Sequence, residues 1–216
     1  MQHTFLLADL AGFTALTEAH GDKMAADVAE EFARAMRELL VEHTGEEVKR
    51  LGDGVLLRLD RAADALRLAA KAVSDLGGRH GALGVRIGMH TGPAVSRGDD
   101  WFGATVNLAA RVAGEAGRAE VLLTAATRDA ADAGLDGFGV RSLGRRRLRN
   151  LSEAIELFAL VLAEDGCTDM ALDPVCRMAV DPDHPHDQVR HAGETHVFCS
   201  SSCAALFRAS PERFVH

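Results

Sequence analysis

No apolar run in this 216-residue chain approaches the roughly 18 residues that a membrane-spanning helix needs. The N-terminal residues 1–4 also lack the basic and long apolar regions of a signal peptide. An excess of positive charge is missing as well: the net charge is -8, which argues against a nucleic-acid-binding surface spread over the whole molecule. From these absences we expect a cytoplasmic protein with no membrane span and no nucleic acid as partner.

Cysteine is absent from residues 1–166. All four cysteines lie in the last 50 residues, and so do five of the ten histidines. So abrupt a change in composition, directly after the apolar residues 157–163, marks a domain boundary. The length also exceeds the ~100 to 150 residues of one domain and favours a medium domain followed by a small one. We therefore predict a first domain over residues 1–164 and a second over 165–216.

A carboxylate at the tip of a predicted β-hairpin is the first candidate site. Apolar residues on both sides of Gly52-Asp53-Gly54 predict two strands joined by a tight turn over residues 48–59. Glycine on either side of Asp53 permits positive φ and lets a ligand approach the backbone closely. Asp-Gly is also ordinary turn chemistry, so the role of Asp53 depends on the rest of the chain.

The remaining pattern predicts an α+β first domain. Apolar spacing and composition predict helices over residues 22–43, 61–76, 104–116 and 125–133. Short apolar or alternating runs predict strands over residues 5–8, 83–90, 121–124, 145–149 and 154–162, with a loop at 96–100. The order β-α-β-β-α-β, with further elements behind it, is typical of a ferredoxin-like fold.

Four separated motifs resemble the class III adenylate and guanylate cyclase catalytic domain. Each is weak alone, but four in the same order across a matching pattern of elements are specific. They are Asp9-Leu10-Ala11-Gly12-Phe13-Thr14, Lys49-Arg50-Leu51-Gly52-Asp53, Val85-Arg86-Ile87-Gly88-Met89-His90-Thr91-Gly92 and Phe102-Gly103-Ala104-Thr105-Val106-Asn107-Leu108-Ala109-Ala110-Arg111. The resemblance covers residues 1–162 and implies a nucleotide cyclase.

By this resemblance Asp9 and Asp53, with the backbone carbonyl of Leu10, bind two divalent metal ions. A cyclase must activate a ribose 3'-hydroxyl for attack on the α-phosphorus while pyrophosphate leaves. Two Mg²⁺ or Mn²⁺ ions about 3.5 to 4 Å apart can serve both ends of that reaction, and such hard ions prefer carboxylate oxygens. The plain alternative is a pair of strand-end aspartates that only cap turns.

Asn107 and Arg111 are four residues apart and therefore share one face of the predicted helix. The resemblance implies that Asn107 binds the ribose and that Arg111 stabilises the phosphate in the transition state, for which a permanently charged guanidinium is suited. Taken alone, the pair also fits the solvated polar face of an Ala-rich helix.

Lys49 and Asp100 hold the positions that read the base in resembling enzymes. Adenine offers an acceptor at N1 and a donor at its 6-amino group, so a matching pocket needs one donor and one acceptor. Lys49 is only a donor and ionised Asp100 only an acceptor, which predicts ATP as the substrate. Asp99 is the neighbouring alternative for the acceptor.

One position departs from the family pattern. Leu151 stands nearest to where family members often carry a lysine that binds the triphosphate tail. Arg149, in the basic run 145–149, is the candidate substitute, and the alternative is that this run forms a solvated edge strand. The family also works as a dimer, with the metal aspartates on one subunit and the base-reading and transition-state residues on the other. A homodimer is therefore implied here.

The tail resembles the YHS (TRASH-like) domain, which is associated with heavy-metal handling. The resemblance rests on residues 173–180, 198–203 and 211–214, although Arg177 stands where the family motif usually has glycine. It implies a small Cys-rich α+β domain at the C-terminus.

Cys176, Cys199 and Cys203 are spaced as C-x22-C-x3-C. In a cytoplasm such grouped thiols favour a metal over a disulfide, and Zn²⁺ or Cu⁺ suits them. A closed tetrahedral site needs a fourth ligand, and the candidates are His196, His191 and Cys167. The plain alternative is that these cysteines pack as small hydrophobic residues.

Together these features predict a homodimeric adenylate cyclase fused to a metal-binding module that can tune it. Two alternatives are a catalytically inactive, cyclase-like dimeric metal sensor and a guanylate cyclase. The complete set of site residues argues against the first alternative, and Lys49 argues against the second.

Overall fold

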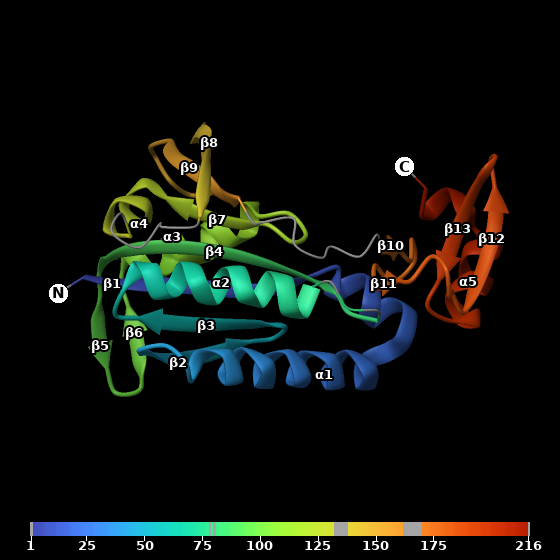
Figure 1. Cartoon of the computed structure of the whole chain (residues 1–216), viewed down its shortest axis with the longest axis horizontal. Coiled ribbons are helices and arrows are strands. Elements are labelled where there is room, and N and C mark those ends of the chain that lie inside the picture. Colours follow the sequence, from blue (N-terminus) through green and yellow to red (C-terminus); the bar gives the residue numbers. More distant parts are fainter. Residues whose placement is uncertain (1, 78, 80, 132–137, 162–169, 216) are drawn as a thin grey trace.

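The computed structural model describes residues 2–77, 79, 81–131, 138–161 and 170–215. Residues 2–161 (the N-terminal region) build a seven-stranded sheet in the order β2-β3-β1-β4-β7-β9-β8 (Figure 1). Its strands are β1 (Gln2–Ala11), β2 (Gly45–Leu51), β3 (Gly54–Leu59), β4 (Gly84–Pro93), β7 (Val121–Thr124), β8 (Gly139–Arg146) and β9 (Ile155–Val161). Strand β1 lies between β3 and β4 and is antiparallel to both, whereas β4 and β7 are parallel.

Helices cover both faces of this sheet. They are α1 (Phe13–Leu40), α2 (Ala62–Gly77), α3 (Ala104–Glu115) and α4 (Ala125–Ala130). Leu6 and Ala8 of β1 belong to the main core with Phe32 of α1 and Leu66 of α2. Phe5 instead belongs to a second cluster with residues of α3. Because successive side chains of a strand point to opposite faces, α3 lies on one face of the sheet and α1 and α2 on the other.

The mixed α+β fold is confirmed, and the order β1-α1-β2-β3-α2-β4 is the predicted one. Three elements differ from the sequence prediction. Helix α1 begins at Phe13, not at residue 22, and bends at Gly21 (φ 82°, ψ 167°). Because of the bend, residues 13–20 do not continue the apolar face of the longer segment, which is why the sequence pattern did not include them. The expected loop at 96–100 is instead the tip of a hairpin of β5 (Val95–Arg97) and β6 (Asp100–Phe102), whose short, largely exposed strands carry little apolar alternation.

Strand β8 is the third difference, since it runs from Gly139 to Arg146 and not over residues 145–149. It is an edge strand paired with β9, and its mostly exposed residues give no buried alternation to read. The predicted domain boundary at residues 164–165 lies outside the described residues, as does the end of the predicted helix 125–133. No helix within the described ranges combines the length and apolar character needed to cross a bilayer.

Residues 170–215 (the C-terminal module) pack against one end of the N-terminal region, where Figure 1 draws them in orange and red. Their elements are β10 (Ala171–Leu172), β11 (Ala179–Val180), β12 (Asp187–His191), β13 (Glu194–Phe198), α5 (Ser201–Ala209) and the 3-10 helix Pro211–Arg213. Phe198, Cys203 and Phe207 are fully buried. These side chains belong to the same hydrophobic cluster as Leu83 and Val85 of the N-terminal region, so the two parts share one core.

Candidate active site and metal centre

Two acidic residues meet where β1 ends and the β2–β3 turn begins. Ala8 of β1 pairs with Val55 of β3, which brings Asp9 beside the turn that carries Asp53. A side-chain carbon at Gly54 would lie 3.3 Å from Oδ1 of Asp9, so glycine leaves that carboxylate room to face the turn. Burial, and after it the negative charge of Asp9, raises the pKa of Asp53 to about 6. Asp9 and Asp53 (the acid pair) therefore interact electrostatically at this end of the sheet.

Arg86 is a member of this site that was not singled out from the sequence. Its Nε donates to Oδ2 of Asp9 at 2.9 Å, and its Nη2 donates to the same oxygen. The contact follows from the antiparallel register, which places Arg86 of β4 directly opposite Asp9 of β1. That register was the signal that could have revealed it. Arg86 thus binds one oxygen of Asp9 and leaves Oδ1 directed toward the turn.

Leu10 follows Asp9 in β1 and buries its side chain in the main core, with 4% of it exposed. Because side chains alternate along a strand, this burial turns Asp9 to the face that carries Phe5 and α3. Leu10 therefore anchors the end of β1 and sets the direction of the neighbouring carboxylate.

Lys49 and Asp100 are in contact. Nζ of Lys49 donates to both carboxylate oxygens of Asp100, at 2.8 and 2.7 Å. This bond, together with the backbone N–H of Trp101, lowers the pKa of Asp100 below its usual range. It is Asp100, not the neighbouring Asp99, that meets Lys49. The structure thus joins one donor and one acceptor from β2 and β6, which are 51 residues apart in the sequence.

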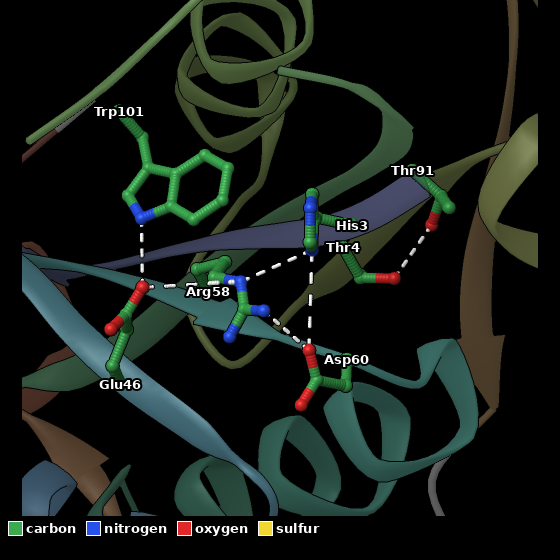
Figure 2. A network of polar contacts seen from close by, with 7 residues as sticks. All are labelled: His3, Thr4, Glu46, Arg58, Asp60, Thr91 and Trp101. Atoms are coloured by element: carbon green, nitrogen blue, oxygen red, sulfur yellow. Dashed lines mark hydrogen bonds and ion pairs between the residues drawn. The ribbon is translucent and has the colours of Figure 1, made fainter. Parts of the chain in front are cut away.

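A polar network holds β6 in place beside Lys49 (Figure 2). Trp101 donates from its indole nitrogen to Oε1 of Glu46 at 2.7 Å, and its ring lies edge-on to His3 at 4.6 Å between centroids. The guanidinium of Arg58 lies over the indole at 5.2 Å and also contacts Asp60. Contacts with Glu46, His3 and Arg58 thus hold Trp101, the neighbour of Asp100, in place.

Asn107 and Arg111 both lie on α3. Asn107 is exposed and Arg111 is half-buried. Helix α3 covers the same sheet face toward which Asp9 points, since Phe5 and Val106 share a cluster. Helix α3 and Asp9 therefore lie on the same side of the sheet.

Arg149 and Leu151 lie beyond the end of β8 and outside any strand. Arg149 is exposed in a turn, and Leu151 packs against a small core cluster around Leu148. The predicted strand over residues 145–149 ends at Arg146, so the position expected for a phosphate-binding side chain is not on a strand.

The three predicted cysteines of the C-terminal module meet a histidine of the N-terminal region. The ligand atoms of His20, Cys176, Cys199 and Cys203 (the thiol cluster) all lie within 4.8 Å of one another. His20, from the first segment of α1, is the fourth member of this cluster, whereas the sequence offered His196, His191 and Cys167 as candidates and not His20. His196 and His191 instead pack against the ring of Phe207, at 4.9 and 5.8 Å between centroids. Cys167, the remaining candidate, lies outside the described residues.

Asp173, like Arg86 and His20, was not singled out from the sequence. It is fully buried, and its Oδ1 accepts the backbone N–H groups of Val175 at 2.8 Å and Cys176 at 3.3 Å. Its Oδ2 accepts the N–H of Cys199 at 2.9 Å. Burial raises the pKa of this carboxyl above its usual range. One carboxylate thus ties together the two chain segments that carry Cys176 and Cys199.

Residues 2–161 match the family model for the adenylate and guanylate cyclase catalytic domain, and residues 171–216 match that for the YHS domain. A pH-sensitive adenylate cyclase of Mycobacterium tuberculosis (strain CDC 1551 / Oshkosh) is 36% identical over 73% of this chain. An adenylate cyclase of Streptomyces coelicolor is 35% identical over 57% of this chain. The aligned part spans only 40% and 34% of these two relatives.

Solved structures show the same fold. One is a Trypanosoma brucei adenylate cyclase in its monomeric state, with a TM-score of 0.70 and 23% identity, covering 76% of this chain and 89% of that one. Another is a guanylate cyclase domain from Catenaria anguillulae in complex with GTP, with a TM-score of 0.66 and 16% identity, covering 76% of this chain and 97% of that one.

Proposed function

Since the chain belongs to the adenylate and guanylate cyclase catalytic domain family, we propose that it is an adenylate cyclase, which converts ATP to 3',5'-cyclic AMP and pyrophosphate. The observation that carries this proposal is the acid pair. Asp9 lies near the end of β1 and Asp53 in the adjacent β2–β3 turn, where burial, and after it the negative charge of Asp9, raises the pKa of Asp53 to about 6. Such a pair is stabilised when cations occupy the space beside it.

The donor set fits Mg²⁺ or Mn²⁺. Carboxylate oxygens of Asp9 and Asp53, with the backbone carbonyl of Leu10, are the hard ligands that these ions prefer. When bound, two such ions lower the pKa of the ribose 3'-hydroxyl and neutralise charge on the phosphates. Arg86 holds Oδ2 of Asp9 and so fixes the carboxylate with Oδ1 toward the turn.

Base selection rests on Lys49 and Asp100. In the proposed enzyme, Lys49 donates to N1 of adenine and Asp100 accepts from the 6-amino group. Guanine reverses both groups, which would leave the Lys49 donor facing a donor and the Asp100 acceptor facing an acceptor. The contact between these two side chains at 2.7 Å supports the assignment, because it brings one donor and one acceptor within the width of a base edge.

Asn107 and Arg111 complete the proposed site from a second copy of the chain. Arg111 supplies a permanent positive charge for the pentavalent phosphate, and Asn107 positions the ribose. We place the acid pair on one subunit and Lys49, Asp100, Asn107 and Arg111 on the other. Each homodimer then holds two equivalent sites. Arg149 is the proposed contact for the triphosphate tail.

The direct test incubates the purified protein with Mn²⁺ and either ATP or GTP and measures both cyclic products. Cyclic AMP from ATP, absent in Asp53→Ala, supports the proposal. Cyclic GMP as the main product identifies a guanylate cyclase. No product from either nucleotide, with a folded dimer, identifies a cyclase-like sensor without catalysis.

A mixing experiment tests the shared site. Asp53→Ala and Arg111→Ala should each be inactive alone, because each removes one half of every site in its own homodimer. Mixed heterodimers contain one intact site, so partial activity should return. Failure to regain activity in verified heterodimers contradicts the shared arrangement.

A further inference from the structure

We propose that His20 of the N-terminal region completes a tetrahedral zinc site with Cys176, Cys199 and Cys203, so that one ion fastens the C-terminal module to the cyclase fold. Nothing in the spacing of the tail cysteines points to this ligand, which lies 156 residues before Cys176 and belongs to the other matched family region.

The spacing of the four ligand atoms fits one ion. Bonds of about 2.3 Å to sulfur and about 2.0 to 2.1 Å to nitrogen give a regular tetrahedron with S···S edges of about 3.8 Å and S···N edges of about 3.5 Å. Sγ of Cys199 lies 3.4 Å from Sγ of Cys176 and 3.8 Å from Sγ of Cys203. Nε2 of His20 lies 3.6 Å from Sγ of Cys199 and 3.4 Å from Sγ of Cys203. These four distances thus fall near the edges of a zinc tetrahedron.

The donor set selects the class of ion. Three thiolates and one imidazole are a closed Cys₃His set, the kind found at structural zinc sites, with no place left for a substrate or water. Carboxylate oxygen, which Mg²⁺ and Ca²⁺ require, is missing from the first coordination sphere. The thiol cluster therefore suits a different metal from the acid pair.

Each cysteine is held in place before any ion binds. The buried carboxylate of Asp173 binds the backbone N–H groups beside Cys176 and Cys199. Ser200 caps helix α5, its Oγ accepting the N–H of Cys203 at 3.2 Å, so Cys203 lies in the first helical turn. A thiolate is favoured there by the helix dipole. This second layer of contacts is what a metal site uses to orient its ligands.

His20 reaches the module because α1 bends directly after it. Gly21 has φ 82° and ψ 167°, a backbone region that is essentially restricted to glycine. The bend lets residues 13–20 turn away from the long segment that covers the sheet, toward the module (Figure 1). The backbone bend at Gly21 thus directs the His20 side chain toward the C-terminal module.

Other contacts across the same boundary agree with this placement. The backbone of Ala179 in β11 bonds to Gly81 at 2.8 Å and to Ala82 at 2.9 Å. Arg118 donates to the carbonyl of Arg177 at 3.0 Å. A side-chain carbon at Gly12 would lie 2.7 Å from Cβ of Arg177, so the module touches the residue that links β1 to α1. The ion would therefore close a junction that backbone and side-chain contacts already define.

This junction connects the zinc site to the acid pair. Gly12 lies three residues after Asp9, and residues 13–20 connect it to His20. Ion binding that fixes His20 also restrains the segment that follows the metal-binding strand. That consequence rests on the proposed cyclase function, whereas the zinc site itself does not.

Zinc affinity of the full chain tests the proposal. Competition with a chromophoric chelator should give one tight site in the wild-type protein. His20→Ala and His20→Gln should each lose on the order of 100-fold in affinity or more, since even outer partners of a metal site contribute 10 to 100-fold. His196→Ala and the exposed control His184→Ala should stay within a few-fold of wild type. A wild-type protein that binds no zinc, or His20 variants with wild-type affinity, overturns the proposal.

Hydrogen exchange supplies a readout that is independent of cyclase activity. Removing zinc from the wild-type chain should speed amide exchange in residues 13–20 and 171–180, whereas in the His20 variants chelation should leave the exchange of residues 13–20 unchanged. Unchanged protection of residues 13–20 on chelation contradicts an inter-domain ligand. An inactive enzyme with this exchange pattern would reject the cyclase proposal alone, so the two ideas fail separately.

Discussion

The acid pair and the thiol cluster are both candidate metal sites, but the chain assembles them differently. Asp9 and Arg86 face each other on neighbouring strands and Asp53 lies in the β2–β3 turn beside them, so the pairing of one sheet brings the three together. The thiol cluster draws three ligands from the C-terminal module and one from α1. A site within one sheet is preserved as long as the sheet is paired, whereas a site across a junction depends on docking and in turn strengthens it. In our proposals the acid pair supports catalysis and the thiol cluster attaches the C-terminal module.

The largest expected effect is a loss of cyclase activity when the acid pair is changed. Asp9→Ala or Asp53→Ala should lower cyclase activity by about 10³-fold or more, because metal stabilisation of charge is worth several kcal/mol. Zinc content, measured on the same preparations, should stay at the wild-type level. Zinc loss in these variants would show that the two sites are not independent.

Zinc removal should have the next largest effect, on stability. An ion present at 100 to 1,000 times its Kd stabilises the folded state by about 2.7 to 4.1 kcal/mol. At roughly 2 to 4 °C per kcal/mol, chelation should lower the Tm of the wild-type chain by roughly 5 to 16 °C in magnesium-free buffer. His20→Gln should start near the lower Tm and respond little to the chelator. Equal responses of wild type and variant would rule out His20 as a ligand.

Substitution of Lys49 should have an intermediate effect on catalytic efficiency and on the preference for ATP. Lys49→Ala removes a charged donor worth about 1.5 to 3 kcal/mol, so kcat/KM for ATP should fall by about 10 to 100-fold. The preference for ATP over GTP should fall with it. Steady-state kinetics with both nucleotides gives the answer, and Lys71→Ala, which removes an exposed lysine bonded to Asp75, is the matched control. An unchanged ATP preference would remove Lys49 from the base site.

The smallest predicted effect is the pH dependence of the acid pair. The folded-state pKa of Asp53 is raised from 3.8 to about 6, so the folded chain binds this proton more tightly than the unfolded chain. Any stability associated with the protonated form is therefore present below about pH 4 and is lost as the pH rises through about 6. Asp53→Asn should raise the Tm relative to wild type at pH 7.5 without divalent ions, but not at pH 4. Millimolar Mn²⁺ should reduce that difference, and a gap that is independent of both pH and Mn²⁺ would contradict repulsion by Asp9.

Local signals drew attention to Asp9, which follows a short apolar run, and to Asp53, which lies in a glycine-flanked turn. Their pairing as metal ligands came from the family resemblance. Arg86 was not identified from the sequence because its contact with Asp9 depends on the register between β1 and β4. That register is fixed by pairing along the whole strand, not by a local motif. Lys49 and Asp100 were correctly matched only through the family resemblance, since no local rule joins residues 51 positions apart.

The fourth member of the thiol cluster could not be predicted from the sequence. Cys176, Cys199 and Cys203 were grouped by spacing, whereas His20 belongs to a segment that was not even predicted as helix. Its approach depends on the bend at Gly21 and on docking of the module, which are tertiary facts. His196 was the natural expectation because it lies near Cys199, but alternation in β13 and packing on Phe207 turn its ring elsewhere. Proximity in sequence was a poor guide at a domain junction.

The most direct measurement is the ratio of cyclic products when the full chain, with Mn²⁺, receives equal concentrations of ATP and GTP in one reaction. The account predicts cyclic AMP in large excess, with both products abolished by Asp53→Ala. Equal or greater formation of cyclic GMP, or no cyclic nucleotide from a correctly folded dimer, would contradict it.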